Sequence, residues 1–174
     1  MYFSLILLVL LLTNCECRML YENIIVEKCC NGETFECCME SLTFKKPLNC
    51  MNISNTRRAI IEDCLHIEMY PYEKNPYKSI DKTCCHVFTG NMYDPDDICY
   101  NTCTTVLQKY FLPNSEKRTK IKSCIVKNPV FNCFNKCVKW SSKNGYDRFD
   151  FEDNCNVLDK VKPGYVYVGK EIDD

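Results

Sequence analysis

The sequence has few of the residues on which most enzyme sites depend. Its 174 residues include five glycines and two histidines, His66 and His86. No Gly-x-Ser-x-Gly motif occurs, and so few glycines leave little material for the turn and backbone amides of an oxyanion hole. No Cys-x-x-Cys or His-x-x-x-His spacing suggests a zinc site. We therefore expect no enzyme activity and no catalytic, metal or cofactor-binding residues.

Two local arrangements resemble sites but are incomplete. His86 follows the double cysteine at residues 84–85, as in secreted phospholipases, but the required aspartate does not follow and no Gly-rich calcium loop precedes. We interpret His86 as a partly buried or surface histidine. Asp94, Asp96 and Asp97 lack the loop glycine and distal glutamate of a calcium loop, and a helix start explains them.

Long hydrophobic segments are also scarce, and the one that occurs lies at the N-terminus. Residues 5–12 are an unbroken apolar run, too short to span a bilayer but suited to an export signal, although no Lys or Arg precedes it. We expect a signal peptide over residues 1–17, with cleavage after Cys17 and cleavage after Cys15 as the main alternative. Later apolar stretches are short and broken by charge, so no membrane span is expected and the protein should be secreted.

Cysteine is the residue in excess. The chain has sixteen, and removal of residues 1–17 leaves fourteen, an even number that favours a mature N-terminus at Arg18. Thiols pair in the oxidising compartments that export reaches, so disulfides are favoured over zinc at the Cys-x-x-x-Cys spacings. The cysteines expected to form bridges are Cys29, Cys30, Cys37, Cys38, Cys50, Cys64, Cys84, Cys85, Cys99, Cys103, Cys124, Cys133, Cys137 and Cys155.

The geometry of neighbouring cysteines limits how they pair. A bridge between adjacent residues closes a small ring that strains the intervening peptide bond. We expect no such bridge within the pairs at 29–30, 37–38 and 84–85. We also expect at least one bridge from the helix bearing Cys99 and Cys103 to the segment 124–137.

Capping residues and prolines mark the expected helices. Asp94–Pro95 opens a helix that Pro113 ends, and Asn128–Pro129 opens another. Others are expected to begin at Thr34, Ser54 and Ser115. Their inward residues, in chain order, are Phe35, Cys38 and Leu42; Ile60, Ile61, Cys64, Leu65 and Met69; Cys99, Cys103, Val106, Leu107 and Tyr110; Ile121, Cys124 and Ile125; and Val130, Cys133, Phe134, Cys137 and Val138.

These patterns predict an all-α, small, disulfide-rich secreted domain with irregular loops. Residues 18–140 form the expected cysteine-rich domain. Residues 141–174 form a polar, acidic C-terminal tail tethered by Cys155, with a short strand possible at residues 165–168. The proline-containing stretch 70–80 reads as a loop. Its tyrosines, Tyr70, Tyr72 and Tyr77, either cover the core, which we favour, or supply contact area for a partner.

A weak internal duplication accompanies the cysteines. The first series is Cys29, Cys30, Cys38, Leu42 and Cys64, and the second is Cys84, Cys85, Cys99, Cys103 and Cys124. Two copies of one helical unit would explain the similar spacing, and coincidence is the alternative.

The cysteine layout resembles the nematode DB module, a cysteine-rich extracellular family without an assigned biochemical activity. The resemblance runs from Cys29 to about Cys137 and is closest at residues 80–85 and 98–103. The cysteines that fit are Cys29, Cys30, Cys38, Cys50, Cys64, Cys84, Cys85, Cys99, Cys103, Cys124 and Cys133. Leu42 stands where the pattern has cysteine, while Cys37, Cys137 and Cys155 are additional. The resemblance implies location and architecture, and no reaction.

Charge gives little direction. Removal of residues 1–17, which include Glu16, leaves 22 basic and 22 acidic residues, so no global field favours nucleic acid or anionic membrane. We interpret the run from Lys117 to Lys122 as a solvated helix face, and expect no nucleic-acid partner. Asn52-Ile53-Ser54 is a glycosylation acceptor, with Asn52 the modified residue.

The function favoured by these observations is a secreted, disulfide-stabilised module that binds an unknown extracellular protein. The first alternative is a small secreted effector, toxin-like or antimicrobial, which a strongly basic amphipathic surface would favour. The second is a secreted hydrolase, which a concave pocket combining His66 or His86 with acidic residues would favour.

Overall fold

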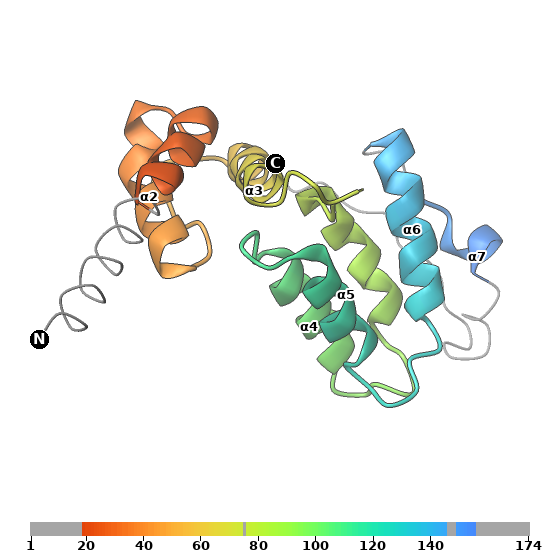
Figure 1. Cartoon of the computed structure of the whole chain (residues 1–174). Helices are drawn as coiled ribbons and strands as arrows, with labels where there is room; N and C mark the ends of the chain where they lie inside the picture. The colour runs from red at the N-terminus through yellow and green to blue at the C-terminus, as the bar shows by residue number, and fades with distance from the viewer. Residues whose placement is uncertain (1–18, 75, 146–148, 156–174) are drawn as a thin grey trace, which may run out of the picture. The chain divides into compact units, whose positions relative to one another are not determined.

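The structure is a computed structural model that describes residues 19–155 except residues 75 and 146–148. Within this part of the chain every regular element is a helix (Figure 1). The all-α, small, disulfide-rich class is therefore confirmed. The predicted signal peptide and the strand at residues 165–168 lie outside the described residues.

The chain divides into two compact units, with the boundary between Pro71 and Tyr72. The first contains a helix over residues 19–29, the 3-10 turn η1 (Gly32–Thr34), α2 (Phe35–Phe44) and α3 (Asn55–Met69). The second contains the 3-10 helix η2 (Ser79–Phe88), α4 (Ile98–Leu107), α5 (Asn114–Lys122), α6 (Phe131–Asn144) and α7 (Phe151–Asn154). This boundary falls inside the segment 18–140 that the sequence suggested as one domain.

In the first unit, Ile25 and Val26 of the N-terminal helix, Leu42 of α2, and Ile61 and Leu65 of α3 are buried. Helix α3 begins as predicted. The Ser54 hydroxyl accepts a 3.1 Å hydrogen bond from the Arg57 backbone N–H and so caps the first turn.

The inward face of α3 is rotated from the expected one. Ile60 is exposed, and the buried positions next to Ile61 and Leu65 are Glu62 and His66. Residues four apart line up along a helix, so Ile61 and Leu65 form an apolar ridge and Glu62 and His66 form a polar ridge beside it. The prediction of Ile60 as an inward residue is wrong because hydrophobicity alone does not distinguish the two sides of this helix.

In the second unit, η2 lies between α4 and α6 and contacts both, while α5 packs on α4 (Figure 1). The core is aromatic near α6. The Phe134 ring lies 5.7 Å from Phe88, 6.0 Å from Tyr77 and 6.1 Å from Phe131, measured between ring centroids. Buried aromatic contacts of this kind add to the hydrophobic stabilisation of the core. Residues 79–88, for which the sequence predicted no helix, form the central element of this unit.

Three helix starts differ from the predictions. Helix α4 begins at Ile98, and Pro95 lies in the preceding turn. Helix α6 begins at Phe131, and the Asn128 side chain donates to the Ile121 carbonyl instead of capping it. Helix α5 begins one residue before Ser115. In both of the first two cases the expected cap side chain makes a longer-range hydrogen bond: Asp94 accepts from the N–H groups of Ile98 and Cys99, and Asn128 donates to α5.

The segment beyond Ser141 is not a solvated tail throughout, because its described part from Phe149 to Cys155 includes core residues. Helix α6 continues to Asn144, and Phe149 and Phe151 are buried. The Phe149 ring lies 5.8 Å from the Trp140 ring. A bridge from Cys155 to Cys133 of α6 fastens this segment.

Seven disulfides join the fourteen described cysteines, and each lies within one unit. The first unit has Cys29–Cys64, Cys30–Cys38 and Cys37–Cys50. The second has Cys84–Cys137, Cys85–Cys103, Cys99–Cys124 and Cys133–Cys155. None of these bridges joins adjacent cysteines, and Cys99–Cys124 links α4 to the segment after α5. Both agree with the pairing predicted from geometry.

The two units repeat one disulfide connectivity. When six cysteines of each unit are numbered in chain order, both units join the first to the sixth, the second to the fourth and the third to the fifth. The sixth members are Cys64 and Cys137, with Cys133 passed over because it pairs with Cys155. This order supports a duplication, but it matches Cys38 with Cys103. The predicted match of Leu42 with Cys103 is therefore corrected, and Leu42 is a buried core residue.

Candidate functional site

The structure places the two histidines in different units. His66 is buried in α3, with its ring 5.1 Å from the Tyr70 ring. His86 is exposed on η2, with its ring 5.6 Å from the Tyr100 ring. Both histidines therefore pack on tyrosines, and they do not belong to one constellation within a unit.

Asp94 organises the loop that leads into α4. Its buried carboxylate accepts hydrogen bonds from the backbone N–H groups of Ile98 at 2.9 Å and Cys99 at 2.6 Å. These are two of the N–H groups that a helix start leaves without an intrahelical partner, so Asp94 caps α4 from outside the helix. Within the described residues, no group of three His, Cys, Asp or Glu side chains could hold a metal ion.

The loop from residue 90 to residue 98, here called the 90–98 loop, is held together by its own polar contacts. Asp97 accepts a hydrogen bond from the Gly90 N–H at 3.2 Å, and the Asn91 side chain accepts one from the Tyr93 N–H at 2.9 Å. Gly90 has a positive φ of 62°, a conformation that glycine adopts without strain. The bridges at Cys99 and Cys103 fix the helix that follows.

This ordered loop exposes large apolar side chains. Met92, Tyr93 and Ile98 are 61%, 52% and 50% exposed. Methionine and tyrosine are enriched where proteins bind one another. The 90–98 loop is therefore the best candidate contact surface of the second unit. From the sequence, its aspartates indicated only the start of a helix, and the exposed apolar residues beside them were not predicted.

The tyrosines of the proline-containing loop have different environments. Tyr72 is almost fully exposed, Tyr70 is half-buried beside His66, and Tyr77 is buried in the core. Burial raises the pKa of Tyr77 above its ordinary 10.0; Arg118 opposes this shift, and Asp81 adds to it. Tyr77 thus covers the core, while Tyr72 remains available for contact.

Comparison with known proteins is consistent with this architecture. The family model of Caenorhabditis elegans Her-1 matches residues 19–159. The protein her-1 of C. elegans is 30% identical over 138 residues, which cover 75% of this chain and 77% of that protein. The crystal structure of C. elegans HER-1 aligns with a TM-score of 0.65 at 26% identity, covering 78% of this chain and 97% of that one.

The matching relative comes from a nematode, as the resemblance seen in the sequence implied, while the DB-module assignment itself stays a prediction. No helix in the described part of the chain is long and apolar enough to cross a membrane. The family model extends from the first described helix through Cys155 and so covers both units. This chain therefore belongs to the family of C. elegans Her-1.

Proposed function

We propose that this protein is secreted and acts by binding another extracellular protein, without catalysing a reaction. The observation that carries the proposal is the 90–98 loop, in which an ordered backbone presents Met92, Tyr93 and Ile98 to solvent. Binding costs less when the contact surface is already ordered, because less conformational entropy is lost. Seven disulfides are the form of stabilisation expected of a chain that works in an oxidising compartment.

The acceptor at Asn52 supports the proposed location. Asn52 is exposed in the turn that precedes α3, with a φ of 58°. An N-linked glycan on this side chain would extend into solvent without displacing a core residue. We propose that Asn52 is glycosylated, with the mature N-terminus at Arg18 after removal of the signal peptide.

A binding measurement on intact cells tests the function. Labelled protein, secreted and fully oxidised, should bind the surface of cells from the source organism saturably, and unlabelled protein should compete. Protease treatment of the cells should abolish the signal, because the proposed partner is a protein. Binding that does not saturate, or that survives protease treatment, would contradict the proposal.

A matched pair of variants tests the loop. Met92→Ser with Tyr93→Ser should weaken cell-surface binding at least about tenfold, because a few central aromatic and apolar side chains usually supply most of the binding energy. The control combines Met19→Ser with Tyr21→Ser, which removes side chains of the first unit that are 57% and 50% exposed, close to the values for Met92 and Tyr93. Equal losses in both variants would exclude the loop as the specific contact.

A further inference from the structure

Basic residues are concentrated in one part of a chain that is nearly neutral overall. Residues 109–143 contain one acidic side chain, Glu116. The basic residues in the same stretch are Lys109, Lys117, Arg118, Lys120, Lys122, Lys127, Lys136, Lys139 and Lys143. The whole chain has 22 basic and 23 acidic residues, so charge is segregated along the sequence even though the total is balanced.

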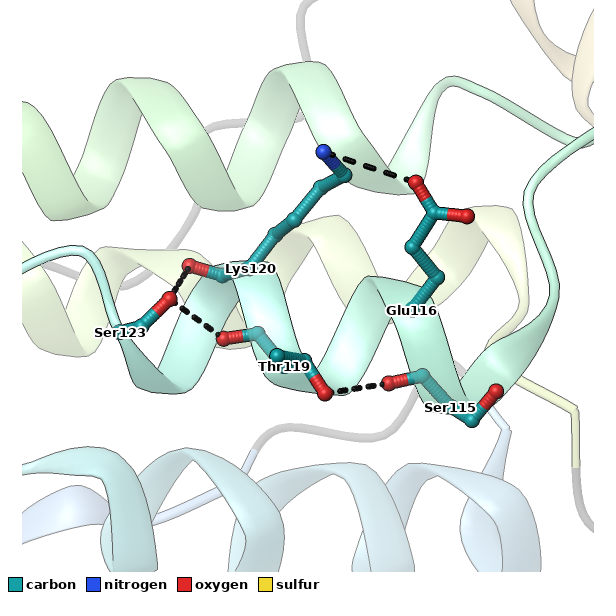
Figure 2. Close-up of polar contacts among 5 residues, drawn as sticks. All are labelled: Ser115, Glu116, Thr119, Lys120 and Ser123. Carbon is teal, nitrogen blue, oxygen red and sulfur yellow. Dashed lines mark hydrogen bonds and ion pairs between the residues drawn. The ribbon is translucent and has the colours of Figure 1, made fainter.

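Helix α5 and the segment after it carry the densest group. Lys117 is buried on the side of α5 that also buries Ile121. The exposed cations are Arg118, Lys120, Lys122 and Lys127. Arg118 and Lys122, four residues apart, share one side of α5, and together with Lys127 they are called here the α5 basic face. Lys120 is paired with Glu116 at 3.5 Å, on one flank of the helix (Figure 2).

Two hydroxyl groups along α5, those of Thr119 and Ser123, point back to the helix backbone. Thr119 donates to the Ser115 carbonyl at 2.9 Å, and Ser123 donates to the Thr119 carbonyl at 2.8 Å (Figure 2). Both hydroxyl protons are therefore used within the helix. The long cationic side chains are therefore the groups on α5 that can contact an anionic partner.

Intramolecular stabilisation explains only part of this arrangement. Lys120 and Lys122 lie in the last turn of α5, where the helix dipole favours positive charge. The same argument does not apply to Arg118 in the helix interior. Arg118 and Lys122 are four residues apart, and like charges at this spacing repel and destabilise a helix slightly. A bound anionic partner would attract both Arg118 and Lys122 and so offset the repulsion between them.

The surface also lacks the groups that other partners need. Among the described residues 109–143, Val126 is the one exposed large hydrophobic residue. Protein interfaces are depleted of lysine and rely on apolar and aromatic anchors, and amphipathic helices bind membranes more strongly when they bury apolar side chains. Clustered lysine and arginine without such anchors suit a flexible polyanion, whose bound counterions are released on contact.

We propose that the α5 basic face binds a sulfated polysaccharide. This rests on the proposed extracellular location, and it assigns a second contact surface apart from the 90–98 loop. Sulfate groups along such a chain would lie against Arg118, Lys122 and Lys127, while Lys120 stays paired with Glu116 on the other side of the helix. Because the contacts are electrostatic, affinity should fall steeply as salt is raised.

Heparin affinity tests the proposal directly. Arg118→Gln, Lys122→Gln and Lys127→Gln together remove three exposed positive charges and leave the Lys120–Glu116 pair intact. The control, Lys45→Gln with Lys46→Gln and Arg57→Gln, removes the same charge from exposed positions of the first unit. Thermal unfolding of both variants establishes that each remains folded.

We expect wild type and control to bind immobilised heparin alike, and the α5 variant to bind at least about tenfold more weakly and to elute at lower salt. Chemically desulfated heparin should bind wild type poorly. Equal binding by the two variants, or retention on desulfated heparin, would overturn the proposal. So would tighter binding to vesicles rich in phosphatidylserine, which would indicate a membrane surface.

The cell-surface assay separates this inference from the proposed function. The α5 variant should keep protease-sensitive cell binding through the 90–98 loop. If the wild-type protein did not bind heparin but still bound cells, only the polysaccharide proposal would be wrong. If it bound heparin normally but showed no saturable binding to cells, the proposed protein-binding function would be wrong instead.

Discussion

The Glu73 carboxylate accepts a 2.8 Å hydrogen bond from the backbone N–H of Asn114, 41 residues later in the chain. Asn114 is the first residue of α5, and its side-chain oxygen in turn accepts a 3.0 Å hydrogen bond from the Tyr77 N–H. A negative group at a helix N-terminus satisfies a free N–H and interacts favourably with the helix dipole. The loop before η2 therefore caps a helix that follows it by some forty residues.

Glu73→Ala should lower the free energy of unfolding by about 1 kcal/mol, the usual cost of losing a helix cap. Glu73→Gln keeps an acceptor oxygen and should lose less. Chemical denaturation of both variants provides the measurement. If the two substitutions had the same small effect as a substitution at exposed Lys74, the capping contact would not stabilise the protein.

Asp94 accepts two backbone hydrogen bonds at the start of α4, and its side chain is buried. Asp94→Ala should therefore destabilise by about 2 to 3 kcal/mol, because two N–H groups lose a charged partner. Asp96→Ala, at an exposed neighbour, is the matched control and should have little effect. Similar unfolding energies for the two variants would show that the carboxylate does not hold the loop.

Tyr77 should make stability depend on pH in the alkaline range. Its pKa is raised by burial, so the folded protein holds the phenol proton more tightly than the unfolded chain does. The corresponding stabilisation is complete below the unfolded pKa near 10.0 and is lost as pH rises through the higher folded value.

The test compares wild type with Tyr77→Phe, which has no proton to lose. Between about pH 9 and about pH 11, the wild-type free energy of unfolding should fall more steeply than that of the variant. Other titrating groups affect both proteins equally. Parallel curves would mean that the Tyr77 hydroxyl ionises as easily in the folded state as in the unfolded chain.

Asn52 should carry an N-linked glycan when the chain is secreted from a eukaryotic cell. Treatment with peptide N-glycosidase F should then lower the apparent mass, and Asn52→Gln should abolish that shift. The substitution should change the melting temperature little, because Asn52 is exposed in a turn. A mass that does not respond to the enzyme would show that the acceptor is unused.

Capping residues and prolines in the sequence predicted some helix boundaries well and others poorly. Ser54 caps α3 as expected, since its side chain and the helix it starts are adjacent in sequence. The start of α4 was misplaced because Asp94 reaches across an additional turn to the Ile98 N–H. Cap residues identify the beginning of a helix only when no ordered loop intervenes.

Tertiary contacts account for the larger differences. Residues 149–155 pack into the core because Phe149 and Phe151 are buried and Cys155 is bridged to Cys133. Neither feature could be predicted from the local polarity of the sequence. The 3-10 helix η2 was not predicted, because the capping residue at its start, Asp81, which accepts a hydrogen bond from the Lys78 N–H, was not recognised as a helix signal. The prediction that adjacent cysteines do not bridge each other was more reliable, because it rests on covalent geometry that tertiary context does not change.

The exposed surface could be predicted least of all. The sequence placed Met92 and Tyr93 beside three aspartates. Only the folded loop shows that Asp94 and Asp97 accept backbone hydrogen bonds while the apolar groups face solvent. The basic run from Lys117 to Lys122 was visible, but burial of Lys117 and the continuation to Lys127 were not.

The central claim is that this Her-1 family member is exported and works with all of its mature cysteines oxidised. The most direct test is intact-mass analysis of protein purified from culture medium, alkylated without reduction and again after full reduction. We predict a chain beginning at Arg18 that takes up no alkyl group before reduction and fourteen afterwards, matching the seven bridges. Retention of the chain inside the cell with Met1 in place, or free thiols in the native secreted protein, would contradict the account.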